Sequence, residues 1–73
     1  MQEDKKRYVK ALGIRVRKLR KEKGLTVQNM CYKNCLGPST LIRIERGLVE
    51  PKYLTLFKIA KAFGMTVSEL VDF

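Results

Sequence analysis

The chain has 73 residues, 45% of them hydrophobic, with two cysteines and no histidine. This length suits one small domain with a single core, which we expect to span residues 1–73. Sixteen Lys and Arg residues against seven Asp and Glu give a formal net charge of +9, which favours anionic partners, nucleic acid ahead of a membrane surface. The sequence offers no glycine-rich phosphate loop and no paired carboxylates on one face, so we expect no enzyme, no cofactor and no metal site.

The positive charge is concentrated in the first third of the chain. Residues 1–24 contain ten basic and three acidic residues, whereas residues 25–73 contain six and four. No stretch approaches the roughly 20 apolar residues of a membrane span, and "MQEDKKRYVK" lacks the apolar core of a signal peptide. We therefore expect a cytoplasmic protein with no membrane partner.

The first expected element is an amphipathic helix over about residues 4–23. Tyr8, Leu12, Val16 and Leu19 form one stripe at spacings of three or four residues, and most charged residues fall outside it. Gly24 follows as a helix-ending signal. This pattern predicts that the stripe packs on the core and that the basic residues face solvent.

A second helix is expected from Thr26, its N-cap, to about Asn34. Leu25 and Met30 have the spacing of a hydrophobic staple across that cap. Cys31 and Cys35 are four residues apart, which is unsuitable for a disulfide on one helix, and two thiols alone are too few for a zinc site. We interpret both as small buried hydrophobic residues, with a redox-sensing thiol as the alternative.

The third helix is contained in "LGPSTLIRIERG". Gly37 is its expected N-cap, Pro38 occupies its first position, and the helix runs to about Arg46, before Gly47. Leu41 and Ile44 are expected to point into the core.

Two further helices follow, and nothing alternates with the period of a strand. The fourth covers about residues 52–63, with Leu56, Ile59, Ala60 and Phe63 inward. The fifth is short and begins with a capping box formed by Thr66 and Glu69, with residues 65 and 70 in staple positions. The sequence therefore predicts an all-α fold of five helices.

Only about three residues, 35–37, separate the second and third helices. So short a link holds two helices at a steep angle, as in a helix-turn-helix, here over about residues 26–46. In that motif the outer face of the second helix is free to enter the major groove of DNA. Because residues 41 and 44 point inward, the outward side chains are those of Ser39, Thr40, Ile42 and Arg43, with Pro38 at the tip.

The sequence resembles the phage-repressor and Cro type of helix-turn-helix, also called XRE-type, in three segments. They are "LGIRVRKLRKEKGLT", "STLIRIERG" and "PKYLTLFKIAKAFGMTVSEL". The resemblance implies a compact five-helix, lambda-repressor-like domain that binds operator DNA, commonly as a two-fold homodimer. It also implies a buried salt bridge between Arg20 and Glu45. The last segment is similar, less specifically, to the controller proteins of restriction-modification systems.

The sequence departs from that family at the expected DNA contacts. Val27 stands where the family usually has glutamine, so Gln28 is the nearest substitute, and residues 48–50 read "LVE" where basic or amide residues often grip phosphate. Arg43 is suited either to bidentate recognition of guanine or to a phosphate contact, and Ile42 either to a thymine methyl or to another protein. The candidate DNA-binding residues are Gln28, Pro38, Ser39, Thr40, Ile42, Arg43, Arg46 and Lys52.

Surplus apolar residues indicate a partner protein. Four have no obvious place in so small a core and are the expected homodimer interface: Tyr53, Phe57, Val71 and Phe73. An alternative is that the whole domain is a protein interaction module, which is suggested by Val27, Ile42, Leu48 and Val49. A cationic helix lying on a membrane is the third hypothesis, and the capped, globular pattern argues against it.

Overall fold

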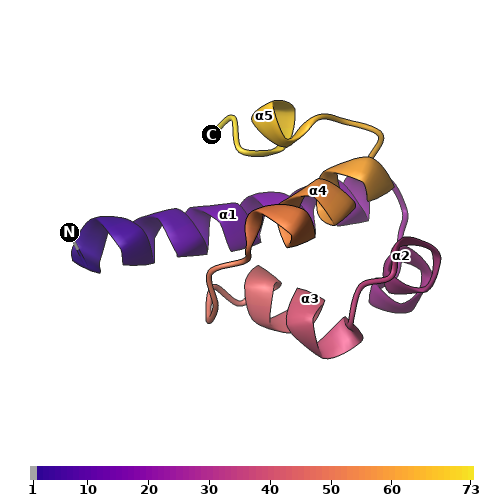
Figure 1. Ribbon diagram of the computed structural model, residues 1–73, viewed down its shortest axis with the longest axis horizontal. Coiled ribbons are helices and arrows are strands. Elements are labelled where there is room, and N and C mark those ends of the chain that lie inside the picture. The colour runs from indigo at the N-terminus through magenta and orange to yellow at the C-terminus, as the bar shows by residue number, and fades with distance from the viewer. Residues whose placement is uncertain (1) are drawn as a thin grey trace.

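The computed structural model describes residues 2–73, with side chains described from Asp4 onward. Within residues 2–73 there are five helices and no strand, which confirms the predicted all-α fold. The helices are α1 (Gln2–Glu22), α2 (Val27–Asn34), α3 (Pro38–Glu45), α4 (Tyr53–Ala62) and α5 (Val67–Leu70). Figure 1 shows α1 along the length of the molecule, with its N-terminal turns projecting beyond the other helices.

Local signals in the sequence account for the helix ends. The hydroxyl of Thr26 accepts a hydrogen bond of 3.0 Å from the backbone N–H of Asn29, and Gly37 and Pro38 begin α3 as predicted. At α5 the Thr66 N–H donates to the Glu69 carboxylate (2.9 Å) and the Glu69 N–H donates to the Thr66 hydroxyl (3.1 Å). The Thr66 hydroxyl also donates to this carboxylate (3.1 Å), and the hydrogen bonds from the Thr66 N–H and hydroxyl hold the pKa of the Glu69 carboxyl below its ordinary value.

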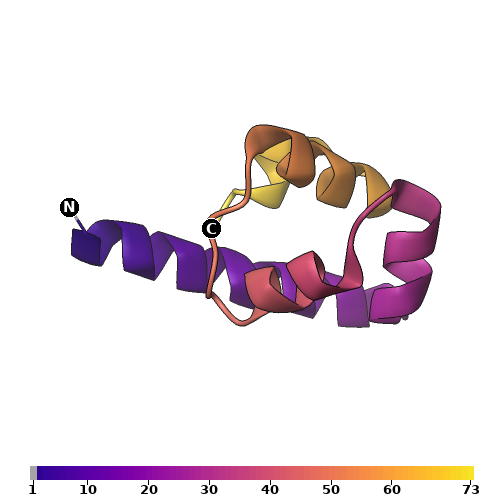
Figure 2. The ribbon, with the colours of Figure 1, turned by 60° about the horizontal axis from the view of Figure 1, so that its bottom comes forward.

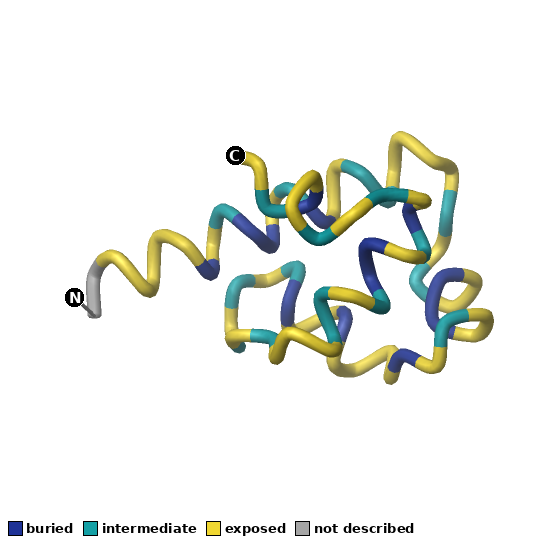
Figure 3. Tube along the Cα trace, turned by 45° about the horizontal axis from the view of Figure 1, so that its top comes forward, coloured by how far each residue is buried: buried dark blue, intermediate teal, exposed yellow. Residues whose placement is uncertain are grey.

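All five helices contribute to the core, and Figure 3 shows its buried positions as dark segments along the chain. Its buried members are Leu12, Val16, Met30, Cys31, Leu36, Leu41, Ile44, Ile59, Ala60, Phe63 and Leu70. Leu19 and Leu56 are partly buried against it. All of the inward positions predicted for α4 therefore contact or belong to the core.

The core stripe of α1 begins one residue later than the sequence indicated. Val9 is 7% exposed, whereas Tyr8 is 51% exposed, so the assignment of Tyr8 to the core was wrong. Val9, Leu12 and Val16 follow the i, i+3, i+7 pattern of a single helix face. The ring of Tyr8 instead lies at the surface, 5.2 Å from the ring of Phe73 between centroids.

The two cysteines have different surroundings. Cys31 is buried, and burial raises the pKa of its thiol. Cys35 is exposed, which contradicts the prediction that both thiols are buried. The reason is that α2 ends at Asn34, so Cys35 is its C-cap in the left-handed region (φ 55°), with its N–H donating to the Cys31 carbonyl. Glycine is the residue that usually occupies such a position.

Candidate nucleic-acid interface

The short link over residues 35–37 places α3 across the body of the domain, where it packs against α1 and α2. Leu41 and Ile44 are buried, so the helix is held by its inner face. Figure 2 shows α3 in front of α1, at the surface of the molecule. The arrangement is a helix supported from behind with its other face towards solvent.

The outer face of α3 is formed by the residues that its spacing predicted. Ser39, Thr40 and Arg43 are exposed, and Ile42 is 42% exposed. Pro38 at the start of the helix and Arg46 just after its end are also exposed. The surface therefore offers two hydroxyl groups, two guanidinium groups and two apolar side chains, those of Pro38 and Ile42.

Two further candidates come from other elements. Gln28 is exposed on α2 and lines a shallow surface groove together with Tyr32 and Pro38, so it lies beside the start of α3. Lys52 is exposed at the N-cap of α4 and lies outside that groove. The structure thus brings Gln28 together with Pro38, while Lys52 is not a member of this groove.

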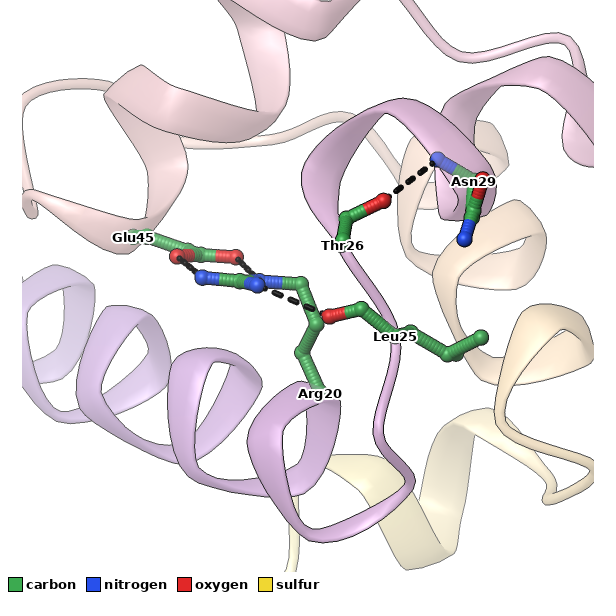
Figure 4. A network of polar contacts seen from close by, with 5 residues as sticks. All are labelled: Arg20, Leu25, Thr26, Asn29 and Glu45. Carbon is green, nitrogen blue, oxygen red and sulfur yellow. Dashed lines mark hydrogen bonds and ion pairs between the residues drawn. The ribbon is translucent and has the colours of Figure 1, made fainter.

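A salt bridge fixes α3 against α1. The Nε of Arg20 lies 2.7 Å from one carboxylate oxygen of Glu45, and its Nη2 lies 3.1 Å from the other. The third nitrogen, Nη1, donates to the Leu25 carbonyl at 2.9 Å, as Figure 4 shows. The side chains of Arg20 and Glu45 are only 13% and 7% exposed. Hydrogen bonding to Glu45 raises the pKa of the Arg20 guanidinium, so the charged pair is favoured.

Gly13 lets α1 and α3 approach closely. A Cβ atom at this position would overlap the backbone carbonyl oxygen of Ile44 and would lie 2.8 Å from that of Glu45. Any side chain would therefore push α3 away from α1. The sequence reasoning overlooked this residue, although an isolated glycine inside a helical pattern is a signal for close packing.

Arg15 is a second residue whose role the sequence reasoning overlooked. Its Nε donates to the Leu70 carbonyl at 2.7 Å and its Nη2 donates to the Glu69 carbonyl at 2.8 Å. These carbonyls belong to the last turn of α5, where the helix itself offers no donors. A basic residue on a helix surface carries no local mark of such a distant partner.

The four residues expected at a dimer interface have different environments. Tyr53 and Phe57 are exposed on α4 and line a groove with the start of α5. Val71 is partly buried against the core. Phe73 is half exposed and lies against Tyr8. Tyr53 and Phe57 thus form one apolar surface, whereas Val71 and Phe73 already have partners within the chain.

The residues that suggested a protein interaction module are partly explained by the core. Val27 and Val49 pack against it, whereas Ile42 and Leu48 remain exposed. None of the helices in the described part of the chain has both the length and the apolar composition needed to cross a membrane.

The domain is basic and all-helical, and α3, the second helix of its helix-turn-helix, packs on other helices with one face and is exposed on the other. These features define the helix-turn-helix class of DNA-binding proteins. The chain belongs to the helix-turn-helix family HTH_3 of transcriptional regulators, whose family model matches residues 16–70. This confirms the XRE-type resemblance and places the protein among DNA-binding transcriptional regulators.

Several known proteins are similar to this chain in sequence or in fold. The uncharacterized HTH-type transcriptional regulator y4dJ of Sinorhizobium fredii is 36% identical over 62 residues, covering 85% of this chain and 80% of that protein. The cryptic phage CTXphi transcriptional repressor RstR of Vibrio cholerae is 33% identical over 58 residues, covering 80% of this chain and 52% of the repressor. The crystal structure of the restriction-modification controller protein C.AhdI from Aeromonas hydrophila matches with a TM-score of 0.81 and 29% identity, over 85% of this chain and 94% of that chain.

Proposed function

We propose that residues 1–73 act as one domain that binds operator DNA by inserting α3 into the major groove. The observation that carries this proposal is the division of α3 into a buried inner face and an exposed polar outer face. An eight-residue helix held in this way fits the groove of B-DNA, which is wide enough for one helix. Because the proposed ligand is genomic DNA, we expect the protein to act in the cytoplasm.

Arg43 is the side chain that we expect to read a base. Its guanidinium group matches the O6 and N7 acceptors of guanine, whereas the hydroxyls of Ser39 and Thr40 suit either a base edge or a phosphate. Ile42 lies on the same face and fits the methyl group of thymine. Gln28, Pro38, Arg46 and Lys52 flank the helix, and we assign them to backbone contacts that position α3.

The test is fluorescence anisotropy with the DNA immediately upstream of the protein's own gene and with a shuffled duplex of the same composition, each at two salt concentrations. We expect the upstream duplex to bind more tightly at both. Arg43→Ala should cost about 1–3 kcal/mol on that duplex and little on the shuffled one, because only a base contact distinguishes them.

Lys18→Ala is the matched control, because it also removes one positive charge and Lys18 is exposed on α1, away from α4 and α5 in the chain. It should leave the preference between duplexes unchanged. Equal affinity for several upstream and shuffled duplexes, with Arg43→Ala behaving like Lys18→Ala, would instead favour a protein interaction module centred on Ile42.

We further propose a homodimer formed through α4 and the C-terminal segment. Tyr53 is 71% exposed and Phe57 shares its surface, and burying such aromatic rings against a second copy is favourable. A two-fold interface uses this surface twice. It would set the two α3 helices about 34 Å apart, one turn of DNA.

Sedimentation velocity at micromolar concentration tests the dimer. Phe57→Asp and Phe73→Asp should shift the protein towards monomer. Ile14→Asp is the control, because Ile14 is 68% exposed on α1 and outside the proposed interface. A wild-type monomer under these conditions, unchanged by either substitution, would rule out this interface.

A further inference from the structure

A basic groove lies where the N-terminal half of α1 passes the loop between α3 and α4. From α1 it is lined by Lys5, Lys6, Arg7, Val9 and Lys10, and from the loop by residues 47–50. Figure 2 shows the loop crossing in front of α1, whose first turns extend past it. Four basic side chains and one carboxylate therefore meet around this groove, which we call the basic groove.

The basic groove lies directly beside the end of α3. Lys6 and Lys10 are seven and three residues before Gly13, so they share the side of α1 that packs on α3. A Cβ atom on Gly47 would lie 3.1 Å from the Cα and 3.0 Å from the Cγ of Lys10. The exposed Arg46 immediately precedes that contact. The groove thus continues the basic surface that begins at the C-terminal end of α3.

The positive charge of the basic groove comes entirely from α1. Residues 47–50 of the loop are Gly, Leu, Val and Glu, so the loop contributes only a negative charge. The Nζ of Lys5 lies 2.9 Å from the carboxylate of Glu50, and this hydrogen bond raises the pKa of Lys5. Lys5 therefore offsets the one carboxylate, and the groove keeps a net positive charge from Lys6, Arg7 and Lys10.

We infer that the basic groove binds phosphates of the DNA backbone next to the segment that α3 reads, with α1 supplying the cations that the loop lacks. This inference rests on the proposed DNA binding. Lys6 and Lys10 contact phosphate, and Lys5 screens Glu50, which would otherwise repel it. A membrane is a poorer fit, because the groove is bordered by the polar surface of α3.

The experiment compares Lys6→Gln and Lys10→Gln with the matched control Lys18→Gln, all three removing one positive charge from α1. Lys18 is exposed and lies outside the basic groove. Affinity for a mixed-sequence duplex of about 30 base pairs is measured across a salt series. The negative slope of log K against log salt should become smaller in magnitude by about 0.9 for each phosphate that the variant no longer neutralises. Lys18→Gln should leave that slope unchanged. Circular dichroism melts confirm that each variant is folded.

Removing the charge of Glu50 should change the affinity for DNA in the opposite direction. Glu50→Gln should tighten binding to the mixed-sequence duplex and steepen the salt dependence, because Lys5 is released towards phosphate. Adding Lys5→Gln to Glu50→Gln should remove that gain. A Glu50→Gln variant with unchanged or weaker binding would contradict the role assigned to the Lys5–Glu50 pair.

The outcomes separate this inference from the proposed function. The basic groove acts without regard to sequence, so its variants should leave the preference for the upstream duplex over the shuffled one intact. If Lys6→Gln and Lys10→Gln match Lys18→Gln in salt slope while that preference persists, the phosphate site is wrong and α3 readout stands. If the preference itself is missing in the wild-type protein, operator recognition fails independently of the groove.

Discussion

Towards α3, α1 is fitted so closely that Gly13 has no room for a side chain, and the Arg20–Glu45 pair beside it is largely shielded from water. Towards α5, the same helix reaches out with Arg15, a partly exposed side chain that donates to two backbone carbonyls. The first contact depends on shape and on a buried pair of charges. The second depends on two hydrogen bonds that are partly or fully exposed to solvent.

This difference indicates that α1 fixes the position of α3 more closely than that of α5. The reading of DNA that we propose for α3 would benefit from a contact that tolerates little displacement. The short α5, with only four residues, needs to cover the core through Leu70 but presents no such face. Substitutions on the two sides of α1 should therefore differ in size and in their effect on DNA binding.

The largest expected effect is at the buried pair. Arg20→Ala or Glu45→Ala should lower the free energy of unfolding by about 3–5 kcal/mol, because each leaves the other charge buried without its partner. The double variant should lose less than the sum of the two. Urea unfolding followed by circular dichroism measures all three.

Arg17→Ala is the control for the buried pair, since Arg17 is exposed on the same helix. Surface changes of this kind usually stay within about 0.5 kcal/mol of wild type. Single variants of Arg20 and Glu45 that unfold like Arg17→Ala would show that the pair contributes no more than a surface contact.

Gly13→Ala comes next, with an expected loss of about 1–3 kcal/mol from overpacking against the carbonyls of α3. Helix propensity alone would give the opposite sign, since alanine is favoured over glycine inside a helix by about 0.5–1 kcal/mol. Ala11→Gly on the same helix measures that propensity term separately. If Gly13→Ala stabilises the protein, the close approach of α1 and α3 is refuted.

Arg15→Ala should have a smaller effect of about 1 kcal/mol, because hydrogen bonds from a charged donor are strong but these are partly exposed to water. Hydrogen exchange at residues 67–73 should accelerate more than exchange in α3. Arg15→Lys, which keeps the charge and one donor, should recover part of the protection. Equal acceleration in α3 and α5 would show that Arg15 supports the whole domain and not α5 in particular.

The smallest expected effect concerns pH. The pKa of Glu69 is lowered in the folded state by hydrogen bonds from Thr66, so its stabilising contribution is present above the ordinary carboxyl pKa. It is lost as the pH falls through the folded-state value. Hydrogen exchange in α5, corrected for intrinsic rates, should therefore show weaker protection in acid. Glu69→Gln keeps a capping side chain and should abolish this dependence; a dependence that persists in the variant would assign it to another group.

Features with local causes could be predicted from the sequence. The caps at Thr26 and Thr66 and the Gly37 and Pro38 pair set helix starts through neighbouring residues alone, and the structure places all of them as expected. The inward positions of α3 followed from spacing in the same way. The Arg20–Glu45 pair was expected only through the family resemblance.

Features that depend on tertiary contacts were missed or misjudged. Arg15 contacts residues more than 50 positions away, and Gly13 is explained only by the backbone of α3. Tyr8 was assigned to the core in place of Val9 because either residue precedes Leu12 by a helical spacing, four or three residues. Cys35 was misplaced because it lies just beyond the end of α2, in the left-handed conformation of the C-cap, and not on the helix face that buries Cys31.

If α3 reads DNA as proposed, its short length limits how many base pairs one copy of the chain can recognise. Eight residues at 1.5 Å each span about 12 Å, which corresponds to between three and four base-pair steps of 3.4 Å. A given sequence of four base pairs recurs by chance about once in 256 positions, and one of eight about once in 65,000. Doubling the number of recognised base pairs therefore greatly reduces the number of chance matches in a genome. For a domain this small, the proposed dimer would therefore increase the specificity of DNA recognition as well as the affinity.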